Sequence, residues 1–184
     1  MIYFTSDLHI GHDKDFIWKD RGFSSIEEHD SAILERWNNT ITRGDTVYIL
    51  GDLCLGQNEK EWDRFYNHLN GTKNFLRGNH DTDNKIIRYI LNYTMEYLGY
   101  ATVLKYNKNW TFYLCHYPTY VENPYESYKK KHIINLFGHT HQHDIFFKDN
   151  PCMYHVGVDS HNLTPVSIEQ IIKDVTNKLN EVKK

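Results

Sequence analysis

Short apolar runs alternate with amphipathic stretches along the first half of the chain. Residues 2–6 and 46–50 form short, mostly apolar runs, which predict two strands, and residues 73–77 predict a third. In the stretches that follow, apolar residues recur at spacings of three and four, which predicts helices over residues 26–41, 62–69 and 85–91. Ser25 and Glu28 form a capping box ahead of the first predicted helix. This alternation of strands and helices is typical of an α/β protein.

The second half of the chain contains mostly strand patterns. Residues 101–106 and 110–115 flank a polar turn and predict an antiparallel hairpin, and residues 133–137 and 152–158 predict two further strands. A terminal helix is predicted because a capping box precedes apolar residues that share one helical face. The box is Ser167 with Gln170, and the apolar face contains Ile168, Ile171, Ile172, Val175 and Leu179. We therefore expect a single domain over residues 1–184, with two packed sheets and helices outside.

Composition and charge narrow the classes of function. A chain of 184 residues with a formal net charge of -3 has no general attraction to nucleic acid or to an anionic membrane. No apolar run approaches the roughly 20 residues of a membrane span, and no basic start precedes an apolar stretch, so neither a membrane segment nor a secretory signal is expected. Cys54, Cys115 and Cys152 lack a paired spacing, which predicts reduced thiols and a cytoplasmic location. The 12 histidines need a chemical explanation.

Potential metal ligands directly follow five of the predicted strands. In open α/β sheets, the loops beyond the carboxyl ends of the strands converge, so distant residues can meet there. Asp7 and His9 follow the first of these strands, Asp52 follows the second, and Asn79, His80 and Asp81 follow the third. His116 follows the strand at residues 110–115, and His139 and His141 follow the strand at residues 133–137. These residue types, without a thiolate, suit Mn, Fe or Zn. If His80 and Asp81 are left out, seven potential ligands remain, which are Asp7, His9, Asp52, Asn79, His116, His139 and His141. This number exceeds the roughly four ligands of a tetrahedral zinc ion, and it fits two ions that share a carboxylate. A single-metal enzyme is the alternative.

The same residues fall into motifs that resemble those of the calcineurin-like metallophosphoesterases. The motifs are Asp7-x-His9, Gly51-Asp52, Gly78-Asn79-His80-Asp81, a lone His116 and Gly138-His139-Thr140-His141, and they follow the family's order over residues 7–141. The resemblance implies a four-layer α/β sandwich of two mixed sheets flanked by helices. It also implies a small phosphoesterase that has no cap domain.

The resemblance implies that the seven ligand candidates hold two divalent metal ions, which would be Mn, Fe or Zn. Asp52 would bridge the two ions, and a hydroxide between them would attack phosphorus. The family pattern assigns Asp7, His9 and His141 to the first ion. It assigns Asn79, His116 and His139 to the second.

The resemblance further implies that His80 is the general acid and that Asp81 orients its ring. A proton donor is most useful when the leaving group is a poor alkoxide, which favours a small phosphodiester substrate over a phosphomonoester. The chain has no Arg soon after Gly51-Asp52, unlike protein Ser/Thr phosphatases. A non-catalytic scaffold with the same fold is the alternative from another class.

The remaining polar residues are less specific. His12 and Arg77 are candidates for substrate binding, although a surface position is as common for a histidine. A surface position is expected for His29, His68 and His143, and a small buried side chain for Cys54. The tyrosine-rich residues 117–128 either line the pocket or pack, and the lysines at 129–131 are too few for a nucleic-acid patch. Nothing in the pattern favours one oligomeric state.

Overall fold

The computed structural model describes residues 1–56, 59–120 and 132–182, and these residues form two β-sheets. The first sheet has the strand order β4-β3-β2-β1-β9, and the second has the order β5-β6-β7-β8. The strands of the first sheet are β1 (Ile2–Thr5), β2 (Thr46–Leu50), β3 (Thr72–Leu76), β4 (Glu96–Tyr97) and β9 (Val166–Ser167). Those of the second are β5 (Ala101–Lys105), β6 (Trp110–Cys115), β7 (His132–Phe137) and β8 (Met153–His155).

Both sheets are mixed, as expected. Strands β1 to β4 are parallel to one another, and β9 joins β1 in the antiparallel sense. In the second sheet, β5 and β6 form the expected antiparallel hairpin, whereas β7 and β8 continue it in parallel. Because the parallel strands run in register, the carboxyl ends of β1, β2 and β3 lie at one edge of the first sheet, and those of β6 and β7 lie together in the second.

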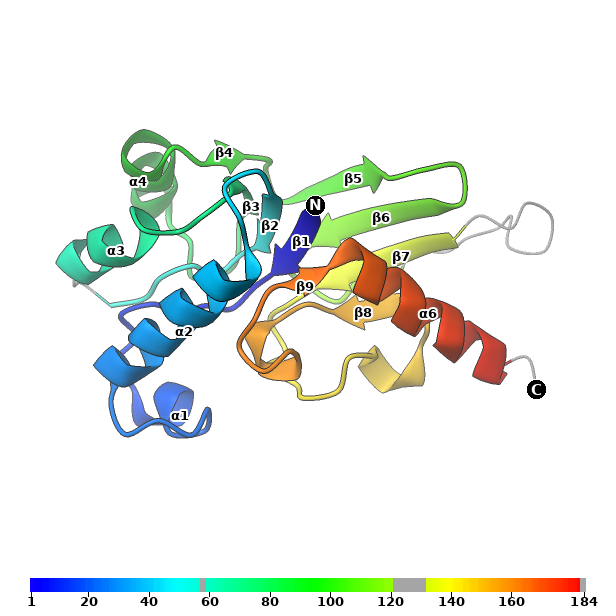
Figure 1. The fold of residues 1–184 in the computed structure, drawn as a ribbon, viewed down its shortest axis with the longest axis horizontal. Helices are drawn as coiled ribbons and strands as arrows, with labels where there is room; N and C mark the ends of the chain where they lie inside the picture. Colours follow the sequence, from blue (N-terminus) through cyan, green and yellow to red (C-terminus); the bar gives the residue numbers. More distant parts are fainter. Residues whose placement is uncertain (57–58, 121–131, 183–184) are drawn as a thin grey trace.

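The two sheets pack against each other, and helices cover the other face of the first sheet (Figure 1). Between the sheets, Phe4 of β1 and Phe112 of β6 lie in one buried cluster, with ring centroids 6.1 Å apart. Burial of this cluster stabilises the sandwich because it removes apolar surface from water. The helices are α1 (Asp15–Trp18), α2 (Ile26–Thr40), α3 (Glu59–Tyr66), α4 (Asp83–Tyr93) and α6 (Ile168–Val182). Helices α2, α3 and α4 cover that face of the first sheet, whereas α6 contributes Ile171 and Val175 to the cluster that contains Phe4 and Phe112. The predicted sandwich of two mixed sheets with flanking helices is therefore confirmed.

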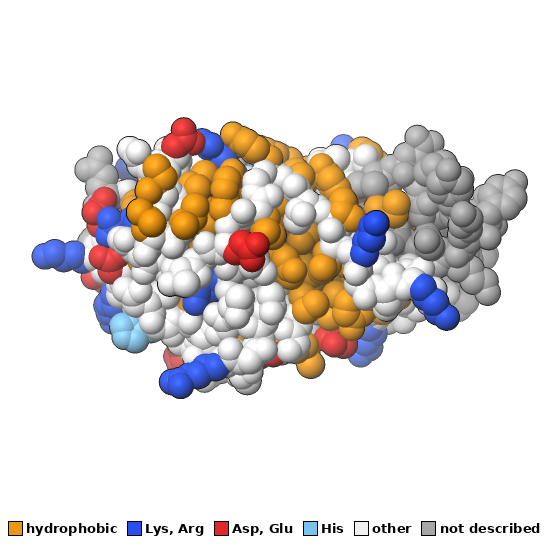
Figure 2. Space-filling view, turned by 90° about the horizontal axis from the view of Figure 1, so that it is seen from above, with side chains coloured by type: hydrophobic (Ala, Val, Ile, Leu, Met, Phe, Trp, Pro, Cys, Tyr) orange, Lys and Arg blue, Asp and Glu red, His pale blue; other side chains and the backbone are white. Residues whose placement is uncertain are grey.

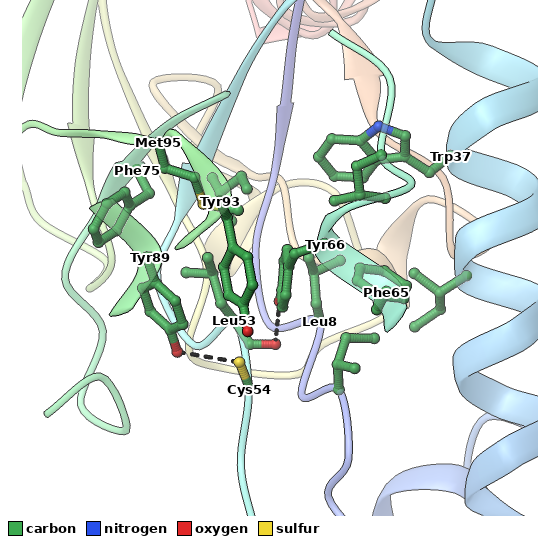
Figure 3. Packing of buried hydrophobic residues seen from close by; sticks show 14 of the residues in the cluster. Leu8, Trp37, Leu53, Cys54, Phe65, Tyr66, Phe75, Tyr89, Tyr93 and Met95 are labelled. Atoms are coloured by element: carbon green, nitrogen blue, oxygen red, sulfur yellow. Dashed lines mark hydrogen bonds between the residues drawn. The ribbon is translucent and has the colours of Figure 1, made fainter. Parts of the chain in front are cut away.

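A second buried cluster lies between the first sheet and helices α2, α3 and α4, next to the loop that follows β2 (Figure 3). The hydroxyl of Tyr66 donates to the carbonyl of Leu53 at 2.7 Å, and the hydroxyl of Tyr89 lies 3.2 Å from Sγ of Cys54. Leu53 and Cys54 directly follow Asp52 in the chain. The aromatic core thus anchors the loop that carries Asp52, and Cys54 is buried as expected.

The helix starts agree with the predicted caps. The Oγ of Ser25 accepts from the backbone N–H of Glu28 at 3.2 Å, and the Oγ of Ser167 accepts from that of Gln170 at 3.1 Å. Strand β8 is shorter than predicted because the chain turns into a 3-10 helix at Val158–Ser160. Helix α1 and strands β4 and β9 were not predicted, since elements of two to four residues are too short to show a period.

The face of the molecule over α4 and β5 carries exposed apolar side chains, which appear as orange areas in Figure 2. Ile87 and Leu91 of α4 are 54% and 74% exposed, and Val103 of β5 is 53% exposed. Helix α4 therefore buries only one of its sides. Within residues 1–56, 59–120 and 132–182, no helix is both long enough and apolar enough to cross a bilayer.

Candidate metal centre

Seven potential ligands from five loops meet at the carboxyl ends of the strands. The loop after β1 supplies Asp7 and His9, and the loop after β2 supplies Asp52. The loops after β3, β6 and β7 supply the other four, which are Asn79, His116, His139 and His141. Their mutual distances, given below, show that the structure brings together every residue that the sequence proposed as a ligand.

The first group consists of Asp7, His9 and His141. The Nε2 atoms of the two imidazoles lie 3.1 Å apart, and Nε2 of His141 lies 3.9 Å from Oδ1 of Asp7. One nitrogen or oxygen atom from each of the three residues lies within 4.8 Å of the others. Asp7 and His9 are buried, whereas His141 is partly open to solvent.

The second group forms around the amide oxygen of Asn79. This oxygen lies 2.9 Å from Nε2 of His116 and 2.9 Å from Nδ1 of His139. His116 is fully buried, and its Nδ1 lies 2.7 Å from the carbonyl of Leu50, so Nδ1–H donates and Nε2 faces the group. Asn79 and His139 are exposed, so this group opens to solvent.

The carboxylate of Asp52 lies between the two groups. Its Oδ2 is 3.4 Å from Nε2 of His116 and 3.9 Å from Nε2 of His9. Its Oδ1 accepts the backbone N–H of His80 at 2.9 Å, which fixes the orientation of the carboxylate. One oxygen of Asp52 is therefore shared by histidines of both groups.

The spacing of these atoms suits metal ions. Two ligand atoms that each lie about 2.1 Å from one ion at a right angle are about 3 Å apart. The nitrogen pair of His9 and His141 and the contacts of Asn79 match this separation at 3.1 Å and 2.9 Å. Neutral imidazole nitrogens are also common metal ligands, so the two nitrogens 3.1 Å apart could bind one cation. The donor set and its spacing both fit divalent cations.

The backbone of these loops has an unusual conformation. Residues Asp7, His9, Asp52, His139 and His141 have φ angles between 48° and 68°. This left-handed region is uncommon for residues other than glycine, although Asp and His enter it more often than most. Such conformations persist where the surrounding structure holds them, and they are concentrated at functional sites.

Two glycines allow the loops after β2 and β3 to touch. Gly51 has a φ of 90°, and a Cβ atom there would lie 2.7 Å from Nδ1 of His116. A Cβ atom on Gly78 would overlap the carboxylate of Asp52. Glycine permits this close approach because it has no Cβ atom.

The charges of the cluster shift the pKa values of its members. Burial alone would lower the pKa of His116, but its bond to Asp52 and the charges of Asp7 and Asp52 raise that pKa to about 9. Burial opposes ionisation of Asp52, yet its contacts with His116 and the N–H of His80 lower its pKa to about 2. For Asp7, burial dominates and raises the pKa. The centre thus concentrates negative charge that attracts protons or metal ions.

His80 lies beside the ligands, but Asp81 does not orient its ring. The ring of His80 is partly exposed, and its centroid lies 5.5 Å from that of His9. Contrary to expectation, the buried carboxylate of Asp81 does not bond the His80 ring. It accepts from the backbone N–H groups of Asp52, Leu53 and Gly78 and from the hydroxyl of Tyr89. One of these N–H groups belongs to its own loop and two belong to the neighbouring loop, and together these bonds direct the carboxylate away from the ring. Asp81 therefore ties the loops after β2 and β3 together.

The two weaker candidates differ in position. His12 is buried rather than superficial, and its ring lies between those of His9 and Phe16. Burial, together with the nearby charge of His80, lowers the pKa of His12 to about 4, so the ring is neutral at neutral pH. It lines a cavity of about 400 Å³ next to the centre. Arg77 instead donates to Asp83 at 2.6 Å, at the start of α4.

Other histidines and the tyrosine-rich segment are also placed. His68 and His143 are exposed as expected, but His29 is fully buried, because it shares the inner face of α2 with Ile33. The ring of Tyr117 packs on His116 and His139, with centroids 5.0 Å and 4.8 Å away. Residues 121–131, which include most of this segment and the three lysines, lie outside the described residues.

Two residues next to the centre were missed by the sequence reasoning. Asp159 lies 2.9 Å from Nδ1 of His141, and Arg21 donates to Asp159 and to the backbone carbonyl of Asp7. Asp159 directly follows the predicted strand at residues 152–158, so the rule that found the other ligands could have found it. No periodic signal marks Arg21, which follows the short helix α1.

The chain is similar to known proteins along nearly its whole length. The chain is 32% identical to the uncharacterized protein MJ1445 of Methanocaldococcus jannaschii over 182 residues, which cover 94% of this chain and 89% of that protein. It is 29% identical to the Gene 66 protein of Mycobacterium phage D29 over 199 residues, with 97% and 98% of the two chains covered.

The fold also resembles a solved structure. The crystal structure of the protein of unknown function AQ665 from Aquifex aeolicus has a TM-score of 0.70 to this chain at 23% identity, and the match covers 94% of this chain and 98% of that one. The model of the calcineurin-like phosphoesterase superfamily domain matches residues 1–176. Because this match spans nearly the whole chain and contains all the clustered loops, the protein belongs to the calcineurin-like phosphoesterase superfamily.

Proposed function

We propose that this protein is a dinuclear metal-dependent phosphoesterase that favours phosphodiesters of small molecules. The observation that supports this best is the position of Asp52, whose Oδ2 faces His9 of the first group and His116 of the second. A single-metal enzyme would need only one of the two groups. Two groups that share one carboxylate oxygen are what a pair of neighbouring ions requires.

In this proposal, Asp7, His9 and His141 hold the first ion, and Asn79, His116 and His139 hold the second, with Asp52 shared. Two divalent ions, when bound, supply positive charge that polarises the phosphoryl oxygens and lowers the pKa of the attacking water. Only two of the seven ligands are carboxylates, so the loaded site keeps a positive charge for a phosphate anion. The identity of the ions depends on availability as well as on ligands, and Mn, Fe and Zn all suit this set.

The proton donor in this proposal is His80. Its backbone N–H is held by Asp52, so the residue is fixed relative to the ligands, while its partly exposed ring is open to a substrate. A donor placed there can protonate the alkoxide as the phosphorus–oxygen bond breaks. Asp81 supports this position indirectly, because it bonds the N–H of Gly78 in the loop that carries His80 and the N–H of Asp52 in the neighbouring loop.

The cavity beside His12 is where we place part of the substrate outside the phosphate. His12 belongs both to the wall of this cavity and to the cluster of rings around His9. The volume of about 400 Å³ is sufficient for a small organic group. A diester carries a second organic group that such a cavity can receive, which is a further reason to favour diesters. We also propose a cytoplasmic location, since the cysteine spacing suits a reducing compartment.

The experiment that tests the proposal measures hydrolysis by protein loaded with Mn²⁺ on matched aryl phosphodiesters and phosphomonoesters. We expect turnover of both, with higher kcat/KM for the diester, and a loss of at least about 100-fold in Asp52→Asn. Bound metal is quantified in the same samples, and two ions per chain are expected. Hydrolysis of neither ester, with two ions bound, would support the scaffold alternative. Full activity with one ion per chain would support a single-metal enzyme.

A further inference from the structure

Arg21 and Asp159 form a buried ion pair directly behind the first metal-ligand group. Nε of Arg21 donates to Oδ1 of Asp159 at 2.8 Å, and Nη2 donates to Oδ2 at 3.1 Å. The two side chains are only 4% and 7% exposed. Such a forked pair is geometrically specific because both partners are planar and make two parallel bonds.

We propose that Arg21 and Asp159 are positioning residues for the first of the two metal sites. In this assignment they fix the ring of His141 and the backbone of the loop that carries Asp7 and His9, and they bond no side chain of the second group. The inference rests on the proposed dinuclear function, which it deepens by naming groups that build one half of the centre.

The Asp159 end of the pair sets the orientation of His141. Nδ1 of His141 lies 2.9 Å from Oδ2 of Asp159, and a carboxylate can only accept, so Nδ1–H donates. The proton is therefore held on Nδ1, and the lone pair of Nε2 points toward Asp7 and His9. A carboxylate that orients a ligating histidine in this way also increases its basicity toward a metal.

The Arg21 end of the pair holds the loop after β1. Nη2 donates to the carbonyl of Asp7 at 2.8 Å, and Nη1 donates to the carbonyl of Leu8 at 3.3 Å. Together with the two bonds to Asp159 and a contact of Nη1 with Nε2 of His29 at 2.9 Å, all five N–H groups of the guanidinium have a partner. Asp7 and His9 have left-handed backbone conformations, so this loop needs such external support.

The contact with His29 continues the network to the far side of the loop. Arg21 can only donate, so Nε2 of His29 accepts and its Nδ1–H donates to Asp30 at 2.8 Å. The other oxygen of Asp30 accepts the backbone N–H of Gly11 at 2.9 Å. The loop from Asp7 to Gly11 is thus held at both ends by one continuous chain of bonds.

The second group is supported by different residues. His116 is oriented by the carbonyl of Leu50, and Asn79 contacts His116 and His139. Among the described residues, neither Arg21 nor Asp159 bonds a side chain of this group. The ion pair therefore bonds directly only to residues of the first group. Its link to the second group runs through Asp7, whose carboxylate accepts the backbone N–H of His139 at 2.9 Å. Damage to the ion pair should therefore weaken the first site more than the second.

The test is calorimetric titration of metal-free protein with Mn²⁺ at constant pH. We expect two binding events in the unmodified protein. In Asp159→Asn, an amide N–H must face a donor of Arg21 or His141. One event should therefore weaken by about 10- to 100-fold, while the other changes much less. Asp63→Asn is the control, because both oxygens of Asp63 on α3 bond Nη2 of Arg88 on α4, and Asp63 bonds none of the seven ligands. This control should bind both ions normally.

The identity of the weakened site is established by combination with Asn79→Ala, which removes a ligand of the second site. The double variant Asp159→Asn/Asn79→Ala should lose both tight events, whereas Asn79→Ala alone should keep one. If Asp159→Asn does not fold, as judged by circular dichroism, Arg21→Lys replaces it; its three donors cannot reach all five acceptors, so the same selective weakening is expected.

Two results would overturn the inference while leaving the dinuclear centre intact. One is unchanged affinity for both ions in folded Asp159→Asn and Arg21→Lys. The other is equal weakening of both events, which indicates a general loosening of the fold. By contrast, a single binding event in the unmodified protein would overturn the dinuclear centre itself, and the inference with it.

Discussion

Nε2 of His116 and Oδ2 of Asp52 lie 3.4 Å apart, and this contact contributes to a pKa of about 9 for His116. In the metal-free protein, the proton therefore stays on His116 well above its ordinary pKa of 6.5. A metal ligand must be deprotonated, so an ion that binds Nε2 has to displace this proton. Protons and metal ions thus compete for one atom.

The first prediction concerns the pH dependence of metal binding. Below about pH 9 the folded protein binds this proton, so the apparent affinity of the second site should rise by about tenfold per pH unit between 6.5 and 9. Above that pH the increase should cease. Calorimetry in buffers with different ionisation enthalpies would measure the proton released. An affinity that does not change over this range would contradict the proposed role of His116.

The raised pKa of His116 also affects the stability of the metal-free protein, which should fall over the pH range in which metal binding becomes stronger. A raised pKa means that the folded state holds its proton more tightly than the unfolded chain, which stabilises the fold below pH 6.5. This contribution is lost as the pH rises through about 9. Metal-free protein should therefore become less resistant to urea over the interval in which metal binding becomes stronger, and parallel unfolding curves would show this.

The second prediction concerns His80 and the leaving group. If His80 donates a proton to the departing oxygen, His80→Ala should lower kcat by about 10²- to 10⁴-fold for alkyl diesters. Aryl leaving groups need little protonation, so the loss should be much smaller for a nitrophenyl diester. Metal content should stay the same, because His80 is not a proposed ligand. Equal losses for both substrates would exclude a general-acid role.

The third prediction concerns the close approach of the loops after β2 and β3. Gly78→Ala would place a methyl group on the carboxylate of Asp52 and should cost about 1–3 kcal/mol of stability, with weaker binding of both ions. Gly44→Ala is the control, because a Cβ atom at Gly44 would meet nothing within 4 Å. Thermal unfolding of the two variants provides the comparison, and similar melting temperatures would contradict the packing argument.

The fourth prediction concerns the cavity beside His12. Its wall contains four acidic residues and one lysine, namely Asp13, Glu27, Asp30, Glu61 and Lys14. A negatively charged organic group should be repelled there, so diesters with a neutral group should be hydrolysed at least about fivefold faster than carboxylated analogues of similar size. Kinetics at low and high salt would test this, since screening should reduce the difference. A preference for the anionic analogue would show that the substrate lies elsewhere.

Much of the centre could be predicted because one rule covers it. Each ligand follows a strand whose apolar run is readable, and parallel strands bring their ends together whatever their distance in sequence. His116 shows the strength of this rule, since it has no neighbouring motif and was placed only by its strand. The motif order then supplied the grouping of ligands.

The rest could not be read from the pattern, for reasons that differ between residues. His29 repeats with Ile33 and Trp37 at intervals of four, yet a histidine on an apolar helical face was interpreted as a surface residue because its partner, Arg21, was not recognised. Asp81 was expected to contact its neighbour His80, but the sequence does not show that the backbone N–H groups of Asp52 and Gly78 bond its carboxylate instead. Both errors concern polar partners in tertiary structure, which have no period.

The left-handed backbone at Asp7, His9, Asp52, His139 and His141 has a consequence for how an ion would enter. Protein contacts support several of these conformations, since Arg21 bonds the carbonyl of Asp7 and Asp81 bonds the N–H of Asp52, so we expect a cation to drive little reorganisation there. The protein should therefore differ from small zinc domains that unfold when stripped with a chelator. After removal of its ions, the protein should stay folded and bind a different ion. The metal supply of the cell, rather than a refolding step, would then decide which ions the protein carries.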